Sequence, residues 1–452
     1  MNIEVVFFGP ANAHTTYSLA LVFARWAGWP LQTQIVESTI ASHHNVTVGG
    51  VPFGCVAANV MEREKVTLQL LQHCFCPVNV AAMRGLNGKR LIEVCGSKMA
   101  DLDRHALTAI FYLVSGEGEV TSSVRDRHNR FPSEASLLRH WGVLDLPVAD
   151  ILAEYLQDRV RASLLGLPPI QAAEPVKVSH DVDVPFKLAF KHLSDLPRLI
   201  AGDWLHRRRF DSAWSTLRDW LAVRQGDFER DPYNCFERIL AGHDRAGRHA
   251  DFYFISGHTG GRIDGDYSLD DEPIRSLINE VTRRGHRVGL HPSYCASTSA
   301  DALNVERKRL DKVMYELDIS VPLDAVRTHY LRFDPLQTPA LLQQAGFTED
   351  SSLAFADAAG FRRGTCRSFP LWDWERGCAL NLVEKPLIAM DVSLLAPHYE
   401  GLDHDAAASR IDTLKSECQR HGGTFSLLWH NNNFNSESDF ELYEYAASRI
   451  MP

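Results

Sequence analysis

The segment from Val176 to Asp183 reads VKVSHDVD, an apolar strand that ends in a histidine and two carboxylates. The same arrangement recurs three times further along the chain, where apolar runs end at His291, at His329 and at His430. In a parallel barrel the carboxyl ends of the strands form the active-site face. We therefore expect these four groups, distant in sequence, to converge on one cleft.

Short apolar runs alternate with helical patterns through the second half of the chain, which is typical of βα units and of a parallel sheet or barrel. Strands are expected at residues 176–179, 250–255, 287–290, 325–328, 387–390 and 424–429. Helices are expected between some of them, where apolar residues recur at helical spacing, at residues 274–285, 303–317, 338–346 and 411–423; a glycine ends each of these except the second.

The chain of 452 residues exceeds the size at which one hydrophobic core usually stops growing, and this favours more than one domain. Residues 165–174 read LGLPPIQAAE, follow an amphipathic helix and precede a strand, which is typical of an interdomain linker. The sequence thus predicts a smaller α/β (α+β) domain at residues 1–170 and a larger α/β domain at residues 175–452.

Composition restricts the partners and the compartment. A formal charge of −10 argues against a nucleic-acid partner, and nine scattered cysteines suit a reducing compartment better than a disulfide framework. The first eight residues lack a basic region and are interpreted as a strand rather than a signal peptide, so we expect a cytoplasmic protein. The most apolar stretch, Tyr17 to Pro30, contains Arg25 and is too short to span a bilayer.

The residue types at the strand ends fit one kind of chemistry. An aspartate with two imidazoles supplies the ligands of a catalytic zinc site and leaves one coordination position open. A second carboxylate can then deprotonate water while another histidine protonates a leaving amine, which amounts to metal-assisted hydrolysis of an amide. A single histidine at a strand end is more often structural. The hypothesis therefore rests on the four groups together.

The order of these motifs resembles that of the polysaccharide deacetylases related to nodulation-type chitooligosaccharide deacetylases. The resemblance covers roughly Val176 to the C-terminus, and its motifs here are SHDVD at 179–183, GLHPSY at 289–294, RTHYLRF at 327–333 and LWH at 428–430. The stretches DSSL at 350–353 and GFRRGT at 360–365 resemble a diverged branch found with bacterial surface-polysaccharide genes. The first half resembles the uncharacterised domain that precedes this branch.

The resemblance implies a distorted (β/α) barrel that binds a divalent metal, most often zinc. It makes Asp181 the general base, Asp183 a metal ligand and His291 the first metal histidine. It also makes His430 the general acid, and Arg327 or Arg332 the residue that orients Asp181 or binds substrate. The roles carried over in this way remain expectations until the residues are seen together.

The match breaks where the family places its second metal histidine, because Cys295 occupies that position. His329 is our substitute ligand, since it ends the strand that would carry the family's third motif. Cys295 as a thiolate is a second alternative. His258, in the glycine-rich stretch 256–261, is a third.

The sequence therefore predicts a metal-dependent hydrolase that removes an N-acyl group, most often acetyl, from a sugar in bacterial surface-polysaccharide (O-antigen or capsule) synthesis. The sugar would be linked to a nucleotide, a lipid carrier or an oligosaccharide. Two alternatives stay open: another metal-dependent hydrolysis on the same fold, and a carbohydrate-binding protein that lost its activity when Cys295 replaced the histidine. The oligomeric state is left open by the sequence.

Overall fold

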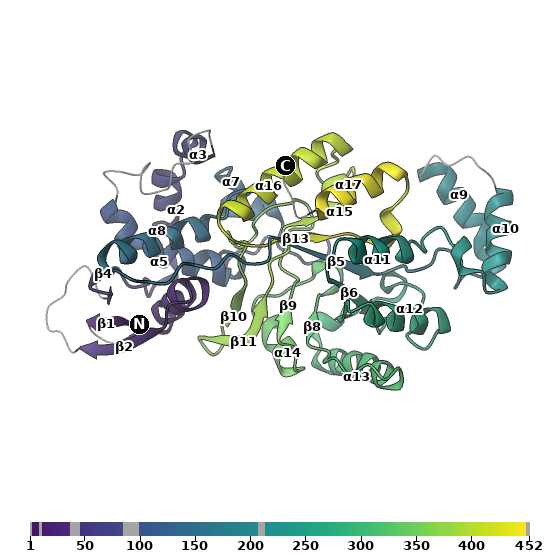
Figure 1. Ribbon diagram of the computed structural model, residues 1–452, viewed down its shortest axis with the longest axis horizontal. Helices are drawn as coiled ribbons and strands as arrows, with labels where there is room; N and C mark the ends of the chain where they lie inside the picture. Colours follow the sequence, from purple (N-terminus) through teal and green to yellow (C-terminus); the bar gives the residue numbers. More distant parts are fainter. Residues whose placement is uncertain (1, 9–10, 37–45, 85–98, 207–212, 449–452) are drawn as a thin grey trace. The chain divides into compact units, whose positions relative to one another are not determined.

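The computed structural model describes residues 2–8, 11–36, 46–84, 99–206 and 213–448. Its contacts divide the chain into two compact units that each mix helices with strands (Figure 1). The first unit comprises residues 1–176 and 331–426, and the second comprises residues 177–330 and 427–448. The predicted α/β class with a parallel sheet is confirmed, whereas closure into a barrel and the domain boundary at 170–175 stay predictions.

The second unit holds the strands that end in the candidate site residues. β5, β6, β7 and β8 are parallel neighbours, and β13 follows β5 in the strand order. Their bounds are β5 (Val176–Val182), β6 (Ala250–Ile255), β7 (Arg287–His291), β8 (Ala325–Val326) and β13 (Phe425–Leu428). β5 pairs in parallel with β6, β6 with β7, and β7 with β8. The carboxyl ends of these four strands therefore lie at the same edge of the sheet.

Burial on both faces explains why these strands read as apolar runs. Every residue of β6 is buried, and so is every residue of β7 after Arg287. Parallel strands are covered by helices on their two faces, so both sets of alternating side chains must be apolar or paired. The register aligns Asp181 with Tyr253 and Ile255 with His291, which fixes how far each site residue stands along the sheet edge.

Helices cover the strands of the second unit (Figure 1). Four of them are α11 (Phe236–Arg245), α12 (Glu272–Arg283), α13 (Ala300–Glu316) and α17 (Glu437–Ala447). α12 buries Ile274, Leu277, Ile278 and Val281 on one face, as the helical spacing predicts. Gly285 has a φ of +79° just past the end of α12, where a left-handed residue closes a helix.

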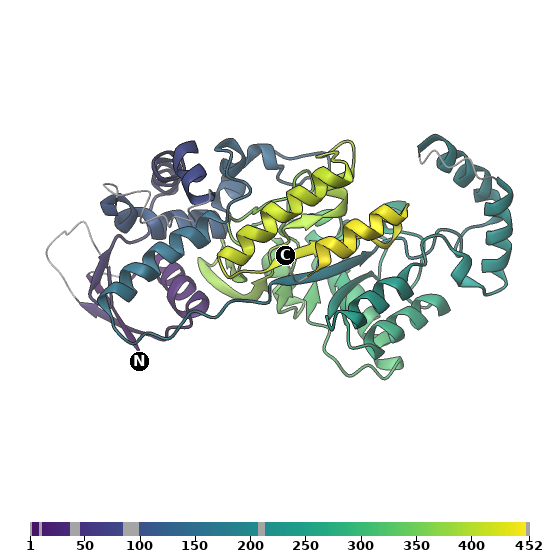
Figure 2. The same cartoon turned by 45° about the horizontal axis from the view of Figure 1, so that its top comes forward.

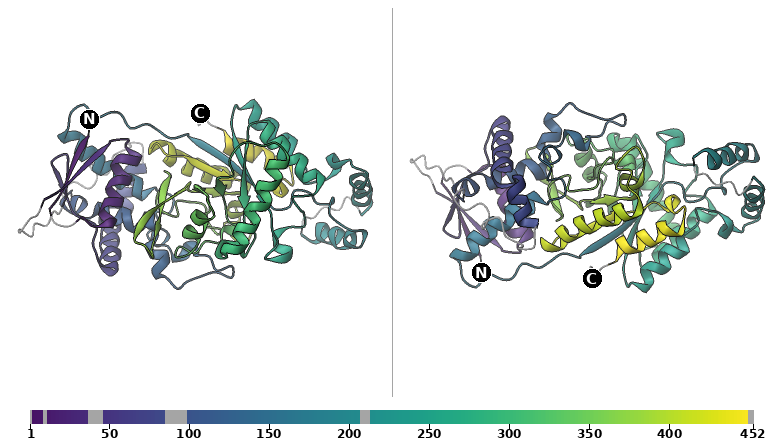
Figure 3. Two further views of the ribbon diagram at one scale, coloured as in Figure 1. Left: turned by 90° about the horizontal axis from the view of Figure 1, so that it is seen from below. Right: turned by 90° about the horizontal axis from the view of Figure 1, so that it is seen from above.

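Two further helices of the second unit stand away from its strands (Figure 3). They are α9 (Leu196–His206) and α10 (Ala213–Arg224). They lie between β5 and α11 in the sequence, and the metal group found among the described side chains includes none of their residues. Among the described helices of the chain, none combines the length and the apolar character that a membrane crossing requires.

The N-terminal part of the first unit forms a small sheet covered by helices. The strand order is β2-β1-β3-β4, with β1 parallel to β2 and antiparallel to β3. The strands are β1 (Ile3–Phe8), β2 (Leu31–Val36), β3 (Val46–Val48) and β4 (Val51–Phe53). The helices are α1 (Ala13–Leu19), α2 (Val60–Cys74), α3 (Pro77–Arg84), α5 (Met99–Ser115), α6 (Glu117–Thr121), α7 (Leu137–His140) and α8 (Val148–Ser163).

Residues 331–426 of the first unit carry three strands that the sequence patterns did not predict and one, Ala389–Met390, that lies within the strand predicted at residues 387–390. β11 pairs antiparallel with β10 and parallel with β9. The elements are α14 (Thr338–Gln344), β9 (Glu349–Asp350), β10 (Phe369–Asp373), β11 (Cys378–Glu384), β12 (Ala389–Met390), α15 (Asp391–Leu395) and α16 (His404–Arg420). The N-cap residue of α14 is Gln337, and Pro339 stands in its first turn.

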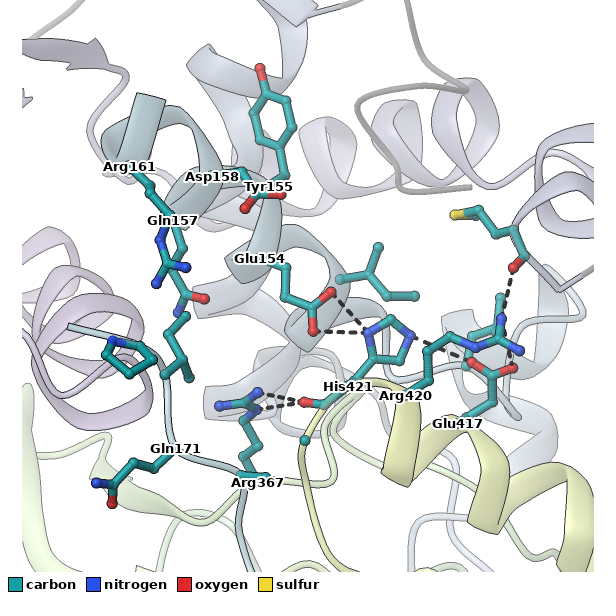
Figure 4. A pocket seen from close by; sticks show the side chains of 17 residues that line it. Glu154, Tyr155, Gln157, Asp158, Arg161, Gln171, Arg367, Glu417, Arg420 and His421 are labelled. Atoms are coloured by element: carbon teal, nitrogen blue, oxygen red, sulfur yellow. Dashed lines mark hydrogen bonds and ion pairs between the residues drawn. The ribbon is translucent and has the colours of Figure 1, made fainter. Parts of the chain in front are cut away.

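A cavity of about 550 Å³ lies within the first unit (Figure 4). Its lining includes Glu154 of α8 together with Glu417 and His421 at the end of α16. His421 Nδ1 lies 3.0 Å from Glu154 Oε2, and its Nε2 lies 3.5 Å from Glu417 Oε2. None of the candidate metal ligands lines this cavity.

Candidate metal centre

Three candidate ligands meet in the second unit. Asp183 directly follows β5, His291 is the last residue of β7, and His329 follows β8. Each of the three side chains offers one ligand atom, and these atoms lie within 4.8 Å of one another. The strand-end pattern in the sequence thus corresponds to one cluster in space.

The separations within the cluster suit a metal ion. His291 Nε2 lies 3.2 Å from Asp183 Oδ1, and His329 Nε2 lies 3.6 Å from Asp183 Oδ2. Zinc bonds to nitrogen and oxygen are about 2 Å long, so two ligand atoms on one ion stand roughly 3 to 4 Å apart. The residues present therefore fit a divalent metal of the zinc class.

The outer ring nitrogens of both histidines are already engaged. His291 Nδ1 lies 2.5 Å from the carbonyl oxygen of Arg327, and His329 Nδ1 lies 2.8 Å from Asp264 Oδ1. A carbonyl or a carboxylate can only accept, so each Nδ1 carries a proton, and Nε2 is the ring atom that is left for a metal ion. Metal-binding histidines are commonly oriented in this way by an outer acceptor.

The charges in the cluster reinforce one another. Burial opposes ionisation of Asp183, yet His329 and His291 hold the pKa of this carboxyl well below its ordinary value. Burial would also lower the pKa of His329, but Asp183 and Asp264 raise the pKa of His329 to about 9. A cation is thus favoured beside Asp183, and a metal ion can take the place of the His329 proton.

The backbone turns sharply directly after His329. Tyr330 has a φ of +59° and Leu331 a φ of +54°, both in the left-handed region that residues with a Cβ rarely adopt. His329 N donates to the carbonyl oxygen of Pro292 at 3.3 Å, so the position is also tied to the turn after β7. Local strain of this kind persists only where surrounding contacts impose it.

Asp181 stands on β5 beside the cluster, two residues before Asp183. Its Oδ1 accepts a 3.0 Å hydrogen bond from Arg327 Nη1, which also donates to Ser179 Oγ at 2.8 Å. Its Oδ2 lies 3.6 Å from His291 Nε2. Arg327 is 2% exposed and stacks over the Tyr253 ring at 4.5 Å, so the guanidinium holds Asp181 in a fixed orientation.

His430 completes the cluster from the end of β13. Its Nε2 lies 3.7 Å from Asp183 Oδ2, and the residue is 9% exposed. The structure therefore brings together all six residues that the sequence proposed for the site. They are Asp181, Asp183, His291, Arg327, His329 and His430.

The other candidates lie elsewhere. Cys295 and His258 are both exposed, and neither belongs to the three-residue metal group found among the described residues. Arg332 falls in the first unit, where its Nε donates to the carbonyl oxygen of His128. Trp429, considered as a stacking surface for sugars, is fully buried and packs on Phe434 and is therefore a core residue.

Sequence reasoning missed Asp264, a buried carboxylate at the end of a 3₁₀ turn. It accepts from His329 Nδ1, from Tyr294 N at 2.6 Å and from Gly260 N at 2.5 Å. These bonds join the glycine-rich loop, the turn after β7 and the third candidate ligand. In the sequence, the glycine-rich stretch 256–261 was the only indication of a functional loop here, and the residue it suggested was His258 and not Asp264.

Comparisons with known proteins add little to this geometry. Residues 5–164 match a family model described as a family of unknown function (DUF7033), in agreement with the uncharacterised domain expected there. No curated protein matched the chain. The chain is similar to the crystal structure of a Mycobacterium smegmatis protein assigned as a polysaccharide deacetylase. The identity is 16%, the match covers 62% of this chain and 86% of that one, and the TM-score of 0.36 is too low to support an argument.

Proposed function

We propose that this protein is a metal-dependent hydrolase that removes an N-acyl group, most often acetyl, from a sugar. The observation that carries the proposal is the convergence of Asp183, His291 and His329, whose ligand atoms lie within 4.8 Å, beside Asp181 and His430. The order of the sequence motifs, which resembles that of the polysaccharide deacetylases, supports the choice of substrate class.

Asp183, His291 and His329 would hold the metal, with Asp264 and the Arg327 carbonyl fixing the two rings. A zinc-class ion, when bound, polarises a carbonyl group and lowers the pKa of water. Asp181 is positioned by Arg327 to accept a proton from the attacking water. The water oxygen then adds to the amide carbon.

His430 follows β13, the neighbour of β5 in the strand order, and its Nε2 lies 3.7 Å from Asp183 Oδ2. In the proposed reaction it donates a proton to the leaving amine nitrogen as the carbon–nitrogen bond breaks. The products are a carboxylate, most often acetate, and the free amino sugar. We place the sugar in bacterial surface-polysaccharide synthesis, where it would be linked to a nucleotide, a lipid carrier or an oligosaccharide.

Two substitutions separate the proposed base from the proposed ligands. Asp181→Asn keeps the size of the side chain and leaves the three ligands untouched, so we expect bound metal with acetate release reduced at least about 100-fold. His291→Ala removes a ligand and should lose both metal and activity. The measurement is metal content together with acetate release from a panel of N-acetylated sugars.

Asp270→Asn is the matched control, because Asp270 is exposed and lies outside the cluster. It should retain both metal and activity. Equal loss of metal in Asp181→Asn and His291→Ala would show that the base assignment is wrong. A wild-type protein that binds metal and releases no acetate from any sugar of the panel would contradict the proposed substrate class.

A further inference from the structure

His180 is fully buried and lies on β5 directly before Asp181, but it takes no part in the metal cluster. Its Nδ1 lies 2.8 Å from the carbonyl oxygen of Trp429, the residue before His430. Its Nε2 lies 3.2 Å from the Tyr443 hydroxyl of α17, which lies beside β5 (Figure 2). His180 therefore contacts the segment that presents the proposed general acid.

The contacts continue to a second buried histidine. The Tyr443 hydroxyl lies 2.9 Å from Nε2 of His243 on α11. His243 is 1% exposed, and its Nδ1 has no hydrogen-bond partner among the described residues. Side chains from three elements, α11, α17 and β5, thus form one continuous set of contacts behind the sheet edge.

Donor and acceptor chemistry gives this set a direction. The Trp429 carbonyl only accepts, so His180 Nδ1 must carry the proton and the neutral His180 ring accepts at Nε2. The Tyr443 hydroxyl can donate to His180 Nε2 and accept from His243 Nε2, and the two Nε2 atoms also lie 3.2 Å from each other. If His243 carries its proton on Nε2, its Nδ1 holds a lone pair and no proton. This agrees with the lack of a hydrogen-bond acceptor near Nδ1 among the described residues.

Burial favours the neutral forms of His243 and Tyr443. Burial, followed by the neighbouring His180, lowers the pKa of His243 to about 2, and burial raises the pKa of Tyr443 far above its ordinary value. His180 also stacks on Phe252, with ring centroids 4.8 Å apart. Hydrogen bonds in such a dry environment are strong, and an unmatched polar group there is costly.

The last contact of this set, from His180 to the Trp429 carbonyl, holds the residue directly before His430. The backbone of Trp429 is held by two residues of β5: its carbonyl accepts from His180 Nδ1, and its N–H donates to the Ser179 carbonyl at 3.1 Å. Ser179 Oγ also donates to the Leu427 carbonyl at 3.1 Å. Two successive residues of β5 therefore fix the last residues before His430.

We infer that the chain from His243 through Tyr443 and His180 to the Trp429 carbonyl is a positioning device for His430. His180 and Tyr443 are positioning residues and not catalytic ones, because they act through the Trp429 peptide. The inference rests on the proposed function for its kinetic consequence, but the hydrogen-bond chain and the placement of His430 can be tested without any assay of activity.

The test uses three substitutions in the full-length protein. Tyr443→Phe removes the hydroxyl that contacts both histidines, and His180→Gln removes the donor to Trp429. His180→Asn keeps a donor near the position of Nδ1 and is the conservative variant. Tyr445→Phe is the matched control, because Tyr445 lies on the same helix and is 41% exposed.

Nitrogen-15 NMR of the histidine rings in the wild type tests the chain directly. We expect the proton of His180 on Nδ1 and that of His243 on Nε2. A His180 proton on Nε2 would overturn the inference, whether or not the protein is a hydrolase.

Crystal structures of the variants test the placement. We expect His430 to be displaced from Asp183 in Tyr443→Phe and His180→Gln, and to keep its place in His180→Asn and Tyr445→Phe. An unchanged His430 in both of the first two variants would overturn the positioning role, even if the wild type hydrolyses nothing.

If the wild type releases acetate, the kinetic constants of the variants provide a third test. Tyr443→Phe and His180→Gln should lower kcat by about 10- to 100-fold with metal content and KM unchanged, since a small misplacement of a catalytic group costs rate and not binding. His180→Asn should recover most of the loss. Equal kcat in all variants would contradict the inference, whereas an inactive wild type would count against the proposed function alone.

Discussion

Two carboxylates set the charge on His329. Burial on its own would lower the pKa of this ring, but Asp183 and then Asp264 raise the pKa to about 9. In the metal-free protein His329 is therefore protonated at neutral pH. A metal ion can bind only after that proton has left, because the ligand is the neutral imidazole.

Metal binding should accordingly release a proton from His329. At pH 7.5 we expect about one proton per metal ion, falling towards zero as the pH rises above about 9, and an affinity that increases over the same interval. Calorimetric titration of the metal-free protein in buffers of different ionisation enthalpy measures this number. His329→Gln should bind metal more weakly and release less than half of that proton.

A proton count near zero at pH 7.5 in the wild type would contradict this assignment. The same result in wild type and His329→Gln would show that the released proton comes from elsewhere. Asp264→Asn offers an independent comparison, since loss of an outer partner typically weakens metal binding by roughly 10- to 100-fold while leaving the ligand set intact.

The sequence was informative about residues that stand at strand ends. Asp181, Asp183, His291, His329 and His430 could all be proposed because an apolar run precedes each of them. Asp264 could not be proposed in this way, because it closes a short turn among glycines and reaches His329 only through the folded chain. The roles of the six site residues remain predictions until they are tested.

At the level of elements, β7 shows how close packing fixes the sheet edge. Gly289 lies in its centre, and a Cβ built there would come within 2.6 Å of the Tyr253 ring on β6. Tyr253 in turn lies under the Arg327 guanidinium. The missing side chain of Gly289 therefore makes room for the aromatic ring that supports the partner of Asp181.

Gly289→Ala should destabilise the protein by about 1 to 3 kcal/mol, because a buried ring has to shift to admit the methyl group. It should also lower activity more than metal content, since Arg327 rests on that ring. The matched control is Gly242→Ala on α11, where the added Cβ meets only the end of a flexible arginine at 3.9 Å. Denaturant unfolding compares the two.

Gly242→Ala is expected to be neutral or slightly stabilising, because alanine favours helix over glycine. A loss of stability equal to that of Gly289→Ala would mean that the cost does not come from the Tyr253 contact. A stable Gly289→Ala variant with full activity would contradict the packing argument itself.

Periodicity predicted the strands and helices that are long or strongly apolar. β6 and α12 agree with their predicted bounds within a few residues, since a buried strand reads as an apolar run and an amphipathic helix as a 3.6-residue repeat. β9 is two acidic residues, and β11 exposes several of its side chains. Such short or half-exposed strands owe their pairing to distant residues and give little signal.

At the level of the whole molecule, the first unit is built from two segments that are separated in the sequence by most of the second unit. Residues 331–426 group with residues 1–176, while the candidate metal centre lies wholly within residues 177–330 and 427–448. A linear pattern of linkers carries no information on such a grouping, because it depends on contacts between distant segments. The boundary predicted at residues 170–175 marks a change in composition and remains a prediction.

His421 gives the first unit a dependence on pH that is separate from the metal centre. Burial lowers and Glu154 and Glu417 raise its pKa, with a net value of about 9 against an ordinary value near 6.5. Because the pKa of His421 is higher in the folded state, protonated His421 stabilises the folded state. This contribution to the free energy of unfolding is complete below about pH 6.5 and is lost as the pH rises through about 9.

We therefore expect the free energy of unfolding to fall between pH 7 and pH 10 by about 1 to 2 kcal/mol more in the wild type than in His421→Gln, after allowing for the partial exposure of Glu154. Denaturant unfolding at both pH values measures the difference. Parallel pH profiles for the two proteins would contradict the role of His421.

The metal content of untagged, chelator-washed protein, measured by elemental mass spectrometry beside His329→Ala, tests the central claim most directly. The account predicts about one divalent ion per chain in the wild type and its loss in the variant, because Asp183, His291 and His329 are the three ligands. Wild-type protein without metal, or a variant that keeps its full content, would contradict it.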